Sequence, residues 1–181
     1  VVEMAACAGL PLAEGQLDPE RATTYGVGEL ILAAKAAGCT KVILGLGGSC
    51  TNDGGAGAAA ALGAVFHRED GTSFVPTGGT PQEIASLDCA PLAEALAGVE
   101  LVAMCDIDNP LFGQEGAAWV FAPQKGADDA MVARLDKGLR HLGEVSCRCL
   151  GKDLSQLPGA GAAGGLGFGM AAFCGAKLQM G

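Results

Sequence analysis

Apolar positions along this chain recur with helical spacing in some segments and form short apolar runs in others. Residues 23–38 predict a helix in which Thr24 caps the first turn and Gly38 ends the last one. Its apolar face is formed by Leu30, Ala33, Ala34 and Ala37. Residues 127–145 predict a second helix with Asp128 as its N-cap and one apolar stripe, made by Met131, Leu135, Leu139 and Leu142.

The other segments favour strands, turns and shorter helices. Apolar runs predict strands at 41–46, at 99–108 and at 117–126, where the third strand runs into a loop. Asp70-Gly71 is a strong turn signal and predicts a hairpin over 63–79. Short helices are expected at 55–62, 80–87 and 91–98, and residues 157–176 are glycine-rich and then apolar. This alternation predicts a layered α/β domain with a mixed β-sheet flanked by helices.

Composition narrows the classes of function. Half of the 181 residues are hydrophobic, which is enough for one domain with a core. The formal charge of −9 and the few aromatic residues argue against nucleic acid as a partner, which needs clustered cations and stacking platforms. No apolar run is long enough to span a membrane, so we expect no membrane partner.

The cysteines are mostly spread singly through apolar segments, and no C-x-x-C pair occurs among them. With His67 and His141 as the only histidines, this spacing argues against a zinc site. We expect buried, reduced thiols in a cytoplasmic protein.

The stretch "GLGGSCTNDGGAGAAAALG", residues 45–63, joins a predicted strand to a predicted helix. Consecutive glycines at such a junction can aim backbone N–H groups and the positive end of the helix at an anion. The candidate binding residues are Gly47, Gly48, Ser49, Thr51, Asn52, Asp53, Gly54 and Gly55. The alternative is a tight turn, in which Gly54 and Gly55 supply positive φ, Asn52 and Asp53 cap the helix, and the alanines allow close packing.

A second glycine-rich stretch contains the spacing G-x-G-x-x-G at Gly159, Gly161 and Gly164. It follows Pro158 rather than a strand, and no acidic residue follows about 20 positions later, so it does not indicate dinucleotide binding. Gly161 and Gly164 are instead candidates for a second anion-binding loop.

The segment "CDIDNP" places Asp106 and Asp108 at the end of an apolar strand, before Asn109-Pro110, and Asn109 is a further candidate for binding the substrate. Carboxylates there suit Mg²⁺ coordination or deprotonation of a substrate hydroxyl. An Asx turn formed by Asp108 or Asn109 is the alternative. In "PQKGA", Lys125 precedes a predicted helix and could neutralise a transferring phosphoryl group, although most lysines are simply solvated.

Six runs, in this order, resemble the bacterial type I glycerate kinase family: "EMAACAGLPL", "TTYGVGELI", "ILGLGGSCTNDGGAGAAAALGA", "CDIDNPLFG", "FAPQKGA" and "PGAGAAGGLGFG". They cover nearly the whole chain. Cys50 stands where the family commonly has a small residue such as alanine. The resemblance implies transfer of the γ-phosphoryl group of ATP to D-glycerate, at the 2-hydroxyl, with Mg²⁺ required.

The resemblance also implies an architecture of two α/β domains that face each other across a cleft. The resemblance implies that residues 1–181 are the inserted second domain of a longer chain, which neither begins nor ends like a natural terminus here. The Rossmann-like first domain would then be the partner of this domain. Glycerate and the nucleotide would be its ligands. Whether the protein also forms a homo-oligomer is left open by the sequence. The alternative is a non-catalytic scaffold or anion-binding module whose glycine-rich turns only serve packing.

Overall fold

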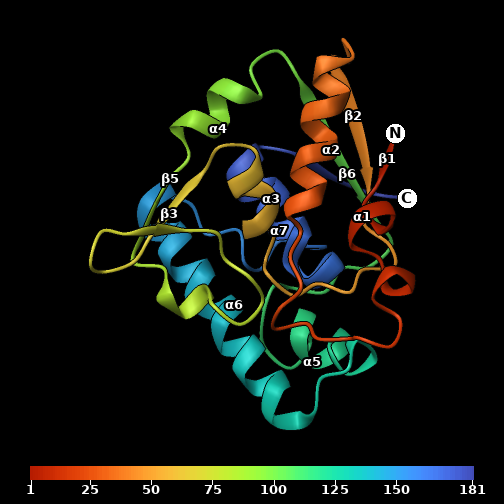
Figure 1. Cartoon of the computed structure of the whole chain (residues 1–181), viewed down its shortest axis with the longest axis vertical. Helices are drawn as coiled ribbons and strands as arrows, with labels where there is room; N and C mark the ends of the chain where they lie inside the picture. The colour runs from red at the N-terminus through yellow and green to blue at the C-terminus, as the bar shows by residue number, and fades with distance from the viewer.

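A four-stranded parallel sheet forms one layer of the computed structural model, which describes residues 1–181 (Figure 1). Its strands lie in the order β1 (Val2–Glu3), β2 (Lys41–Gly45), β6 (Glu100–Cys105) and β7 (Lys177–Met180). All pairings in this sheet are parallel. The strands predicted at 41–46 and 99–108 are confirmed as β2 and β6, and their carboxyl ends lie side by side.

A separate antiparallel sheet contains β4 (Ser73–Phe74), β3 (Val65–His67) and β5 (Ser86–Asp88), in that order. The predicted hairpin is confirmed, and the Asp70 carboxylate accepts the Thr72 N–H at 2.9 Å in its turn. The predicted helix at 80–87 is wrong, since a short 3-10 turn, η2 (Pro81–Glu83), leads into β5. Leu87 pairs with Phe66 across the sheet and is buried there, so tertiary pairing overrides local propensity.

Seven α-helices connect and cover these strands. They are α1 (Ala5–Ala8), α2 (Tyr25–Ala36), α3 (Ala56–Ala61), α4 (Ala90–Ala95), α5 (Ala117–Phe121), α6 (Asp129–Leu150) and α7 (Ala162–Cys174). Two further 3-10 turns are η1 (Leu10–Ala13) and η3 (Pro123–Lys125). None of the helices combines the length and the hydropathy that a membrane span requires.

Helix α6 begins as the sequence predicts. The Asp128 side chain accepts the Met131 N–H at 2.8 Å, which satisfies one of the free donors of the first turn. Leu135, Leu139 and Leu142 are buried on one stripe. The helix is longer than predicted and ends at Leu150, and the following Gly151 has a φ of +71°, which allows the left-handed C-cap.

The strand predicted at 117–126 is wrong, because this segment forms α5 and then η3. Ala117, Ala118 and Ala122 are buried, whereas Trp119 and Val120 are each 44% exposed. This spacing has the period of a helix, so one side of the segment packs against α6 while the bulky residues face outward.

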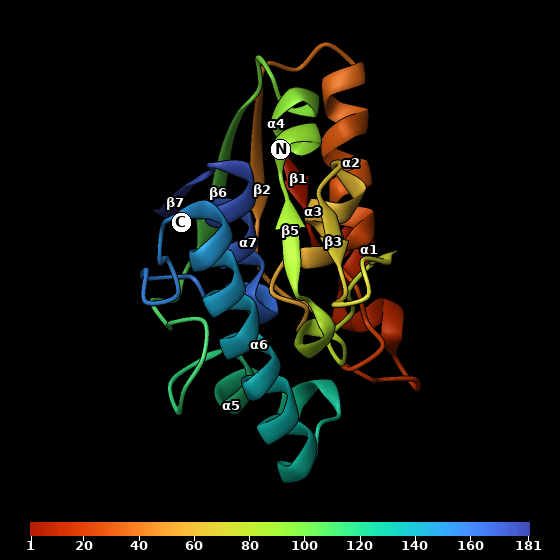
Figure 2. The same ribbon diagram turned by 90° about the vertical axis from the view of Figure 1, so that its left-hand side faces the viewer.

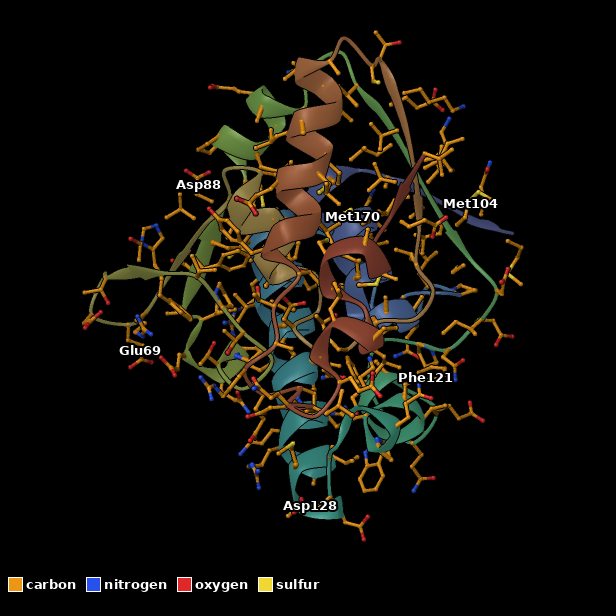
Figure 3. All side chains as sticks on the ribbon, turned by 45° about the vertical axis from the view of Figure 1, so that its right-hand side comes forward. Glu69, Asp88, Met104, Phe121, Asp128 and Met170 are labelled. Carbon is orange, nitrogen blue, oxygen red and sulfur yellow. The ribbon has the colours of Figure 1, made fainter.

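Helices α2, α3 and α7 share the core with the inner face of the parallel sheet. Val42 and Leu44 of β2 and Ala103 of β6 belong to that core, whereas Met104 is partly exposed. Figure 3 shows Met104 and Met170 on opposite sides of the sheet. Figure 1 shows the two sheets on opposite sides of α3 and α7, and Figure 2 shows α6 crossing the front of the lower half of the molecule. The Phe66 ring of β3 meets the Phe173 ring of α7 edge-on, with centroids 5.9 Å apart.

All the cysteines are free thiols. Cys50 and Cys105 are buried, as expected. Cys39 and Cys149 are exposed, so the expectation of burial is wrong for these two.

Candidate active site

A cavity of about 200 Å³ lies where β2 and β6 end. Ligands in open parallel α/β sheets bind at this position, beyond the carboxyl ends of the strands. Met104 and Phe121, both labelled in Figure 3, belong to its wall. The remaining lining residues are Leu46, Gly47, Gly48, Ser49, Cys105, Asp106, Ile107, Gln124, Lys125, Ala162 and Ala163.

The cavity brings together five of the candidate residues from three separate stretches: Gly47, Gly48, Ser49, Asp106 and Lys125. The other candidates do not line it: Thr51, Asn52, Asp53, Gly54, Gly55, Asp108, Asn109, Gly161 and Gly164. The chemistry-bearing stretches therefore converge, but only part of each faces the cavity.

Lys125 is the buried cation of this site, with only 1% of its surface exposed. It ends η3, and its Nζ donates a hydrogen bond to the Thr51 carbonyl oxygen at 2.6 Å. Burial lowers the pKa of the ammonium to about 8, against the opposing influence of Cys50 and Asp53. The interpretation as an ordinary solvated lysine is therefore wrong, because the side chain is buried and its charge is held by a hydrogen bond rather than by bulk water.

Three consecutive residues of the cavity wall have backbone donors that no group of the chain accepts. The N–H groups of Gly47, Gly48 and Ser49 have no acceptor within the chain. Gly48 has a φ of +72°, which turns the backbone directly after Gly47. Unpaired N–H groups next to a buried ammonium form an arrangement that suits an oxyanion.

The second half of the same loop has a structural role. The Asp53 carboxylate is fully buried and accepts the N–H groups of Thr24, Gly55 and Gly57 at 2.7, 3.1 and 3.2 Å. Burial raises the pKa of this carboxyl, and these hydrogen bonds oppose the rise. Asp53 thereby joins the start of α2 to the start of α3, as the tight-turn alternative expects of a capping residue.

The prediction that the Thr24 side chain caps the first turn of α2 is wrong. Thr24 stands at the N-cap position of α2, yet its side chain makes no capping bond to that helix. Its hydroxyl donates to Asp53 at 2.9 Å and accepts the Ala58 N–H of α3 at the same distance. Only the tertiary packing of α2 on α3 makes this contact available.

Asn52 differs from its neighbours because it is fully buried and neither of its side-chain polar atoms has a partner. It is the only such side chain in the protein. Such a side chain is unusual, because most buried polar groups in proteins are hydrogen-bonded.

The two glycine-rich stretches interlock. The Gly54 N–H donates to the Gly164 carbonyl oxygen at 3.0 Å, and a Cβ on Gly164 would lie 1.9 Å from the Thr51 carbonyl oxygen. Ala163 in the cavity wall has a φ of +53°, a strained conformation for a residue with a side chain. Gly161 donates its N–H to the Asn109 carbonyl oxygen at 2.9 Å. The second stretch thus holds the first one and the 105–110 segment in place.

The two carboxylates of "CDIDNP" have different positions. Asp106 lines the cavity, and Asp108 is exposed outside it. Asn109 closes the following loop, because its Nδ2 donates to the Glu115 carbonyl oxygen at 2.7 Å. No group of three or more His, Cys, Asp or Glu side chains is arranged to hold a metal ion. Asp106 is therefore the single carboxylate that the chain offers at the cavity.

The sequence profile described as "Glycerate kinase family" matches residues 1–181. This chain belongs to the glycerate kinase family. It is 45% identical over 179 residues to a glycerate kinase of Halalkalibacterium halodurans, covering 98% of this chain and 47% of the relative. It is 44% identical over 181 residues to glycerate 2-kinase of Escherichia coli K12, covering 99% of this chain and 48% of the relative.

The crystal structure described as glycerate kinase 2 of Salmonella typhimurium LT2 has the same fold, with a TM-score of 0.94 at 44% identity. That similarity covers 98% of this glycerate kinase family chain and 48% of the other. The chain thus spans about half the length of the relatives that it matches. The α/β class predicted from the sequence is confirmed.

Proposed function

We propose that this chain is one domain of an ATP-dependent glycerate kinase, and that the cavity holds the group that receives the phosphoryl group. The observation that carries the proposal is the placement of Lys125, three unpaired backbone N–H groups and Asp106 around one cavity. Its catalytic residues would be Lys125 and Asp106. The relatives named glycerate kinase and glycerate 2-kinase support the substrate and the 2-hydroxyl as the acceptor.

The arrangement suits phosphoryl transfer for a physical reason. This reaction depends mainly on positioning and on stabilising negative charge at the transferring group. Lys125 supplies a positive charge in a poorly hydrated place, where it acts more strongly than in water. Asp106 can accept a hydrogen bond from the attacking hydroxyl and orient it.

One carboxylate does not make a Mg²⁺ site, so the ion would need phosphate oxygens of a nucleotide that reach the edge of this cavity. Mg²⁺ is commonly held by one or two carboxylates and by substrate phosphates, and Asp106 is the carboxylate at the cavity. When bound there, the ion would neutralise charge on the phosphate oxygens. Asp108 lies outside the cavity and would have to move to share it.

We place the second wall of the site in the part of the relatives' sequences that this chain does not cover. The cavity is too small for a whole nucleotide, so the ATP-binding surface would be shared with the Rossmann-like first domain implied by the family resemblance. Free thiols and ATP consumption fit a cytoplasmic protein.

A scaffold without catalytic function is the alternative. The hydrogen bonds of Asp53 favour it for the second half of the loop, from residue 53 onward. The unpaired N–H groups of the first half are not explained by it.

A coupled kinase assay tests the proposal on the complete parent protein. ADP release is followed with D-glycerate, with L-glycerate and without acceptor, and the product is identified by ³¹P NMR. We expect 2-phosphoglycerate from D-glycerate. ADP release that D-glycerate does not increase would refute the proposed activity.

A further inference from the structure

Gly47 stands apart from the other glycines of this chain. Each of the others either has a positive φ or has protein atoms within 4 Å of the place where a Cβ would lie. Gly47 has neither, since its φ is not in the left-handed region and a Cβ would project into open space. The folded chain itself therefore gives no reason for a glycine at this position.

The open space beside Gly47 is the cavity at the strand ends. Gly47 lines this cavity together with Gly48, Ser49, Asp106 and Lys125. Its own N–H and the two that follow have no acceptor. Lys125 uses one of its three N–H donors on the Thr51 carbonyl oxygen, which leaves two for a ligand.

A glycine without a structural reason is costly, because its flexible backbone must be ordered on folding. Where a ligand approaches the backbone closely, the missing side chain is an advantage. The unpaired donors indicate an oxyanion as the group that approaches.

We propose that the carboxylate of the acceptor acid packs on the Cα of Gly47, and that Gly47 thereby limits which acceptors fit. The inference rests on the proposed function and specifies where the carboxylate end of the substrate lies within that site. A carboxylate in this place would accept the free N–H groups of residues 47–49 and face the Lys125 ammonium. The acceptor hydroxyl would then point toward Asp106.

Cavity size favours the acid over the nucleotide as the group beside Gly47. A volume of about 200 Å³ is below the usual size of a site for drug-sized ligands, roughly 300–1,000 Å³. A small hydroxy acid fits such a volume, whereas a whole nucleotide does not. The terminal phosphate of ATP is the competing oxyanion, and the experiment separates the two.

The test is Gly47→Ala in the complete parent protein, with KM measured separately for D-glycerate and for ATP. We expect KM for D-glycerate to rise at least tenfold and KM for ATP to change less than twofold. Gly47→Val should raise KM for D-glycerate further. Thermal unfolding should stay within two degrees for Gly47→Ala, because the added methyl meets no protein atom.

Gly143→Ala is the matched control, since Gly143 lies in α6 outside the cavity and its Cβ would make ordinary contacts from 3.4 Å. It should leave both KM values unchanged. An unchanged KM for D-glycerate in Gly47→Ala overturns the inference, and so does a rise confined to ATP or a loss of thermal stability. A parent protein that phosphorylates no glycerate instead refutes the proposed function.

Discussion

The Lys125 ammonium donates a hydrogen bond of 2.6 Å to the carbonyl oxygen of Thr51, which lies 74 positions earlier in the chain. This contact joins η3 to the glycine-rich loop that follows β2. It places a buried positive charge beside the unpaired N–H groups of that loop. Most of the expected behaviour of the site follows from this pair.

Replacing Lys125 by methionine should separate activity from stability. Under the proposed function, Lys125→Met in the complete parent protein keeps the side-chain length and removes the charge, so kcat/KM for D-glycerate should fall about 100-fold or more. The unfolding temperature should stay the same or rise, because replacing a buried charge by an apolar group is often neutral or stabilising. Steady-state kinetics and calorimetry on the same preparation measure both. A stable variant with full activity would exclude the catalytic role of Lys125.

Activity should decline as Lys125 loses its proton. Its pKa is about 8, so kcat/KM should fall by about tenfold per pH unit above that value. The free energy of unfolding should instead increase as the pH rises through this range. Unfolded lysine has a pKa of 10.5, so the unfolded chain binds more protons between pH 8 and 10.5, and this group makes the unfolding free energy rise there.

Between pH 8 and 10.5, the unfolding free energy of the unsubstituted protein should rise by about 3 kcal/mol relative to that of Lys125→Met. Denaturant unfolding at several pH values measures it, with Lys125→Met as the reference that lacks the titrating group. Parallel pH profiles for the two proteins would show that Lys125 does not titrate in this window.

Asp53→Asn should destabilise the chain by about 2 kcal/mol or more. The amide nitrogen would face N–H donors of Thr24, Gly55 and Gly57, which would leave buried donors unpaired. Asp128→Asn is the control, because Asp128 is an N-cap at the exposed start of α6 and asparagine caps a helix about as well. Equal effects of the two substitutions in urea unfolding would contradict the role assigned to Asp53.

Ala163→Gly should stabilise the fold by about 1 kcal/mol, because it relieves a left-handed conformation that costs about 1–2 kcal/mol for a residue with a side chain. The neighbouring change, Ala162→Gly, should lower stability, since Ala162 is buried and its φ is not positive. The two unfolding free energies should thus move in opposite directions. A loss of stability in Ala163→Gly would show that the packing around Gly164 compensates the strain.

The elements that the sequence predicts well are those with regular spacing or strong local signals. Helix α6 with its cap at Asp128, the hairpin at Asp70-Gly71 and strands β2 and β6 are confirmed. The segments 80–87 and 117–126 were predicted wrongly. Segment 117–126 contains a short apolar run, which is compatible with either a helix or a strand, and packing decides between them. In segment 80–87 the pairing of β5 with β3 overrides the local propensity.

The site shows the same limit within one loop. The pattern from Gly45 to Gly63 left a ligand-binding loop and a tight turn as alternatives, and the structure contains features of both. Residues 47–49 carry the unpaired N–H groups, whereas Asp53 accepts hydrogen bonds at the starts of α2 and α3. Spacing along the chain cannot separate these halves, because both consist of small and polar residues.

The sequence by itself determined the α/β class, the resemblance to glycerate kinases and the stretches that carry chemistry. Only the tertiary structure decided that Lys125 is buried, that Asp106 rather than Asp108 lines the cavity, and that Gly47 faces open space. A local sequence pattern indicates the hydrogen-bonding groups, the charge and the backbone freedom of each residue. Burial and partnership depend on contacts between segments far apart in the chain, which no local pattern contains.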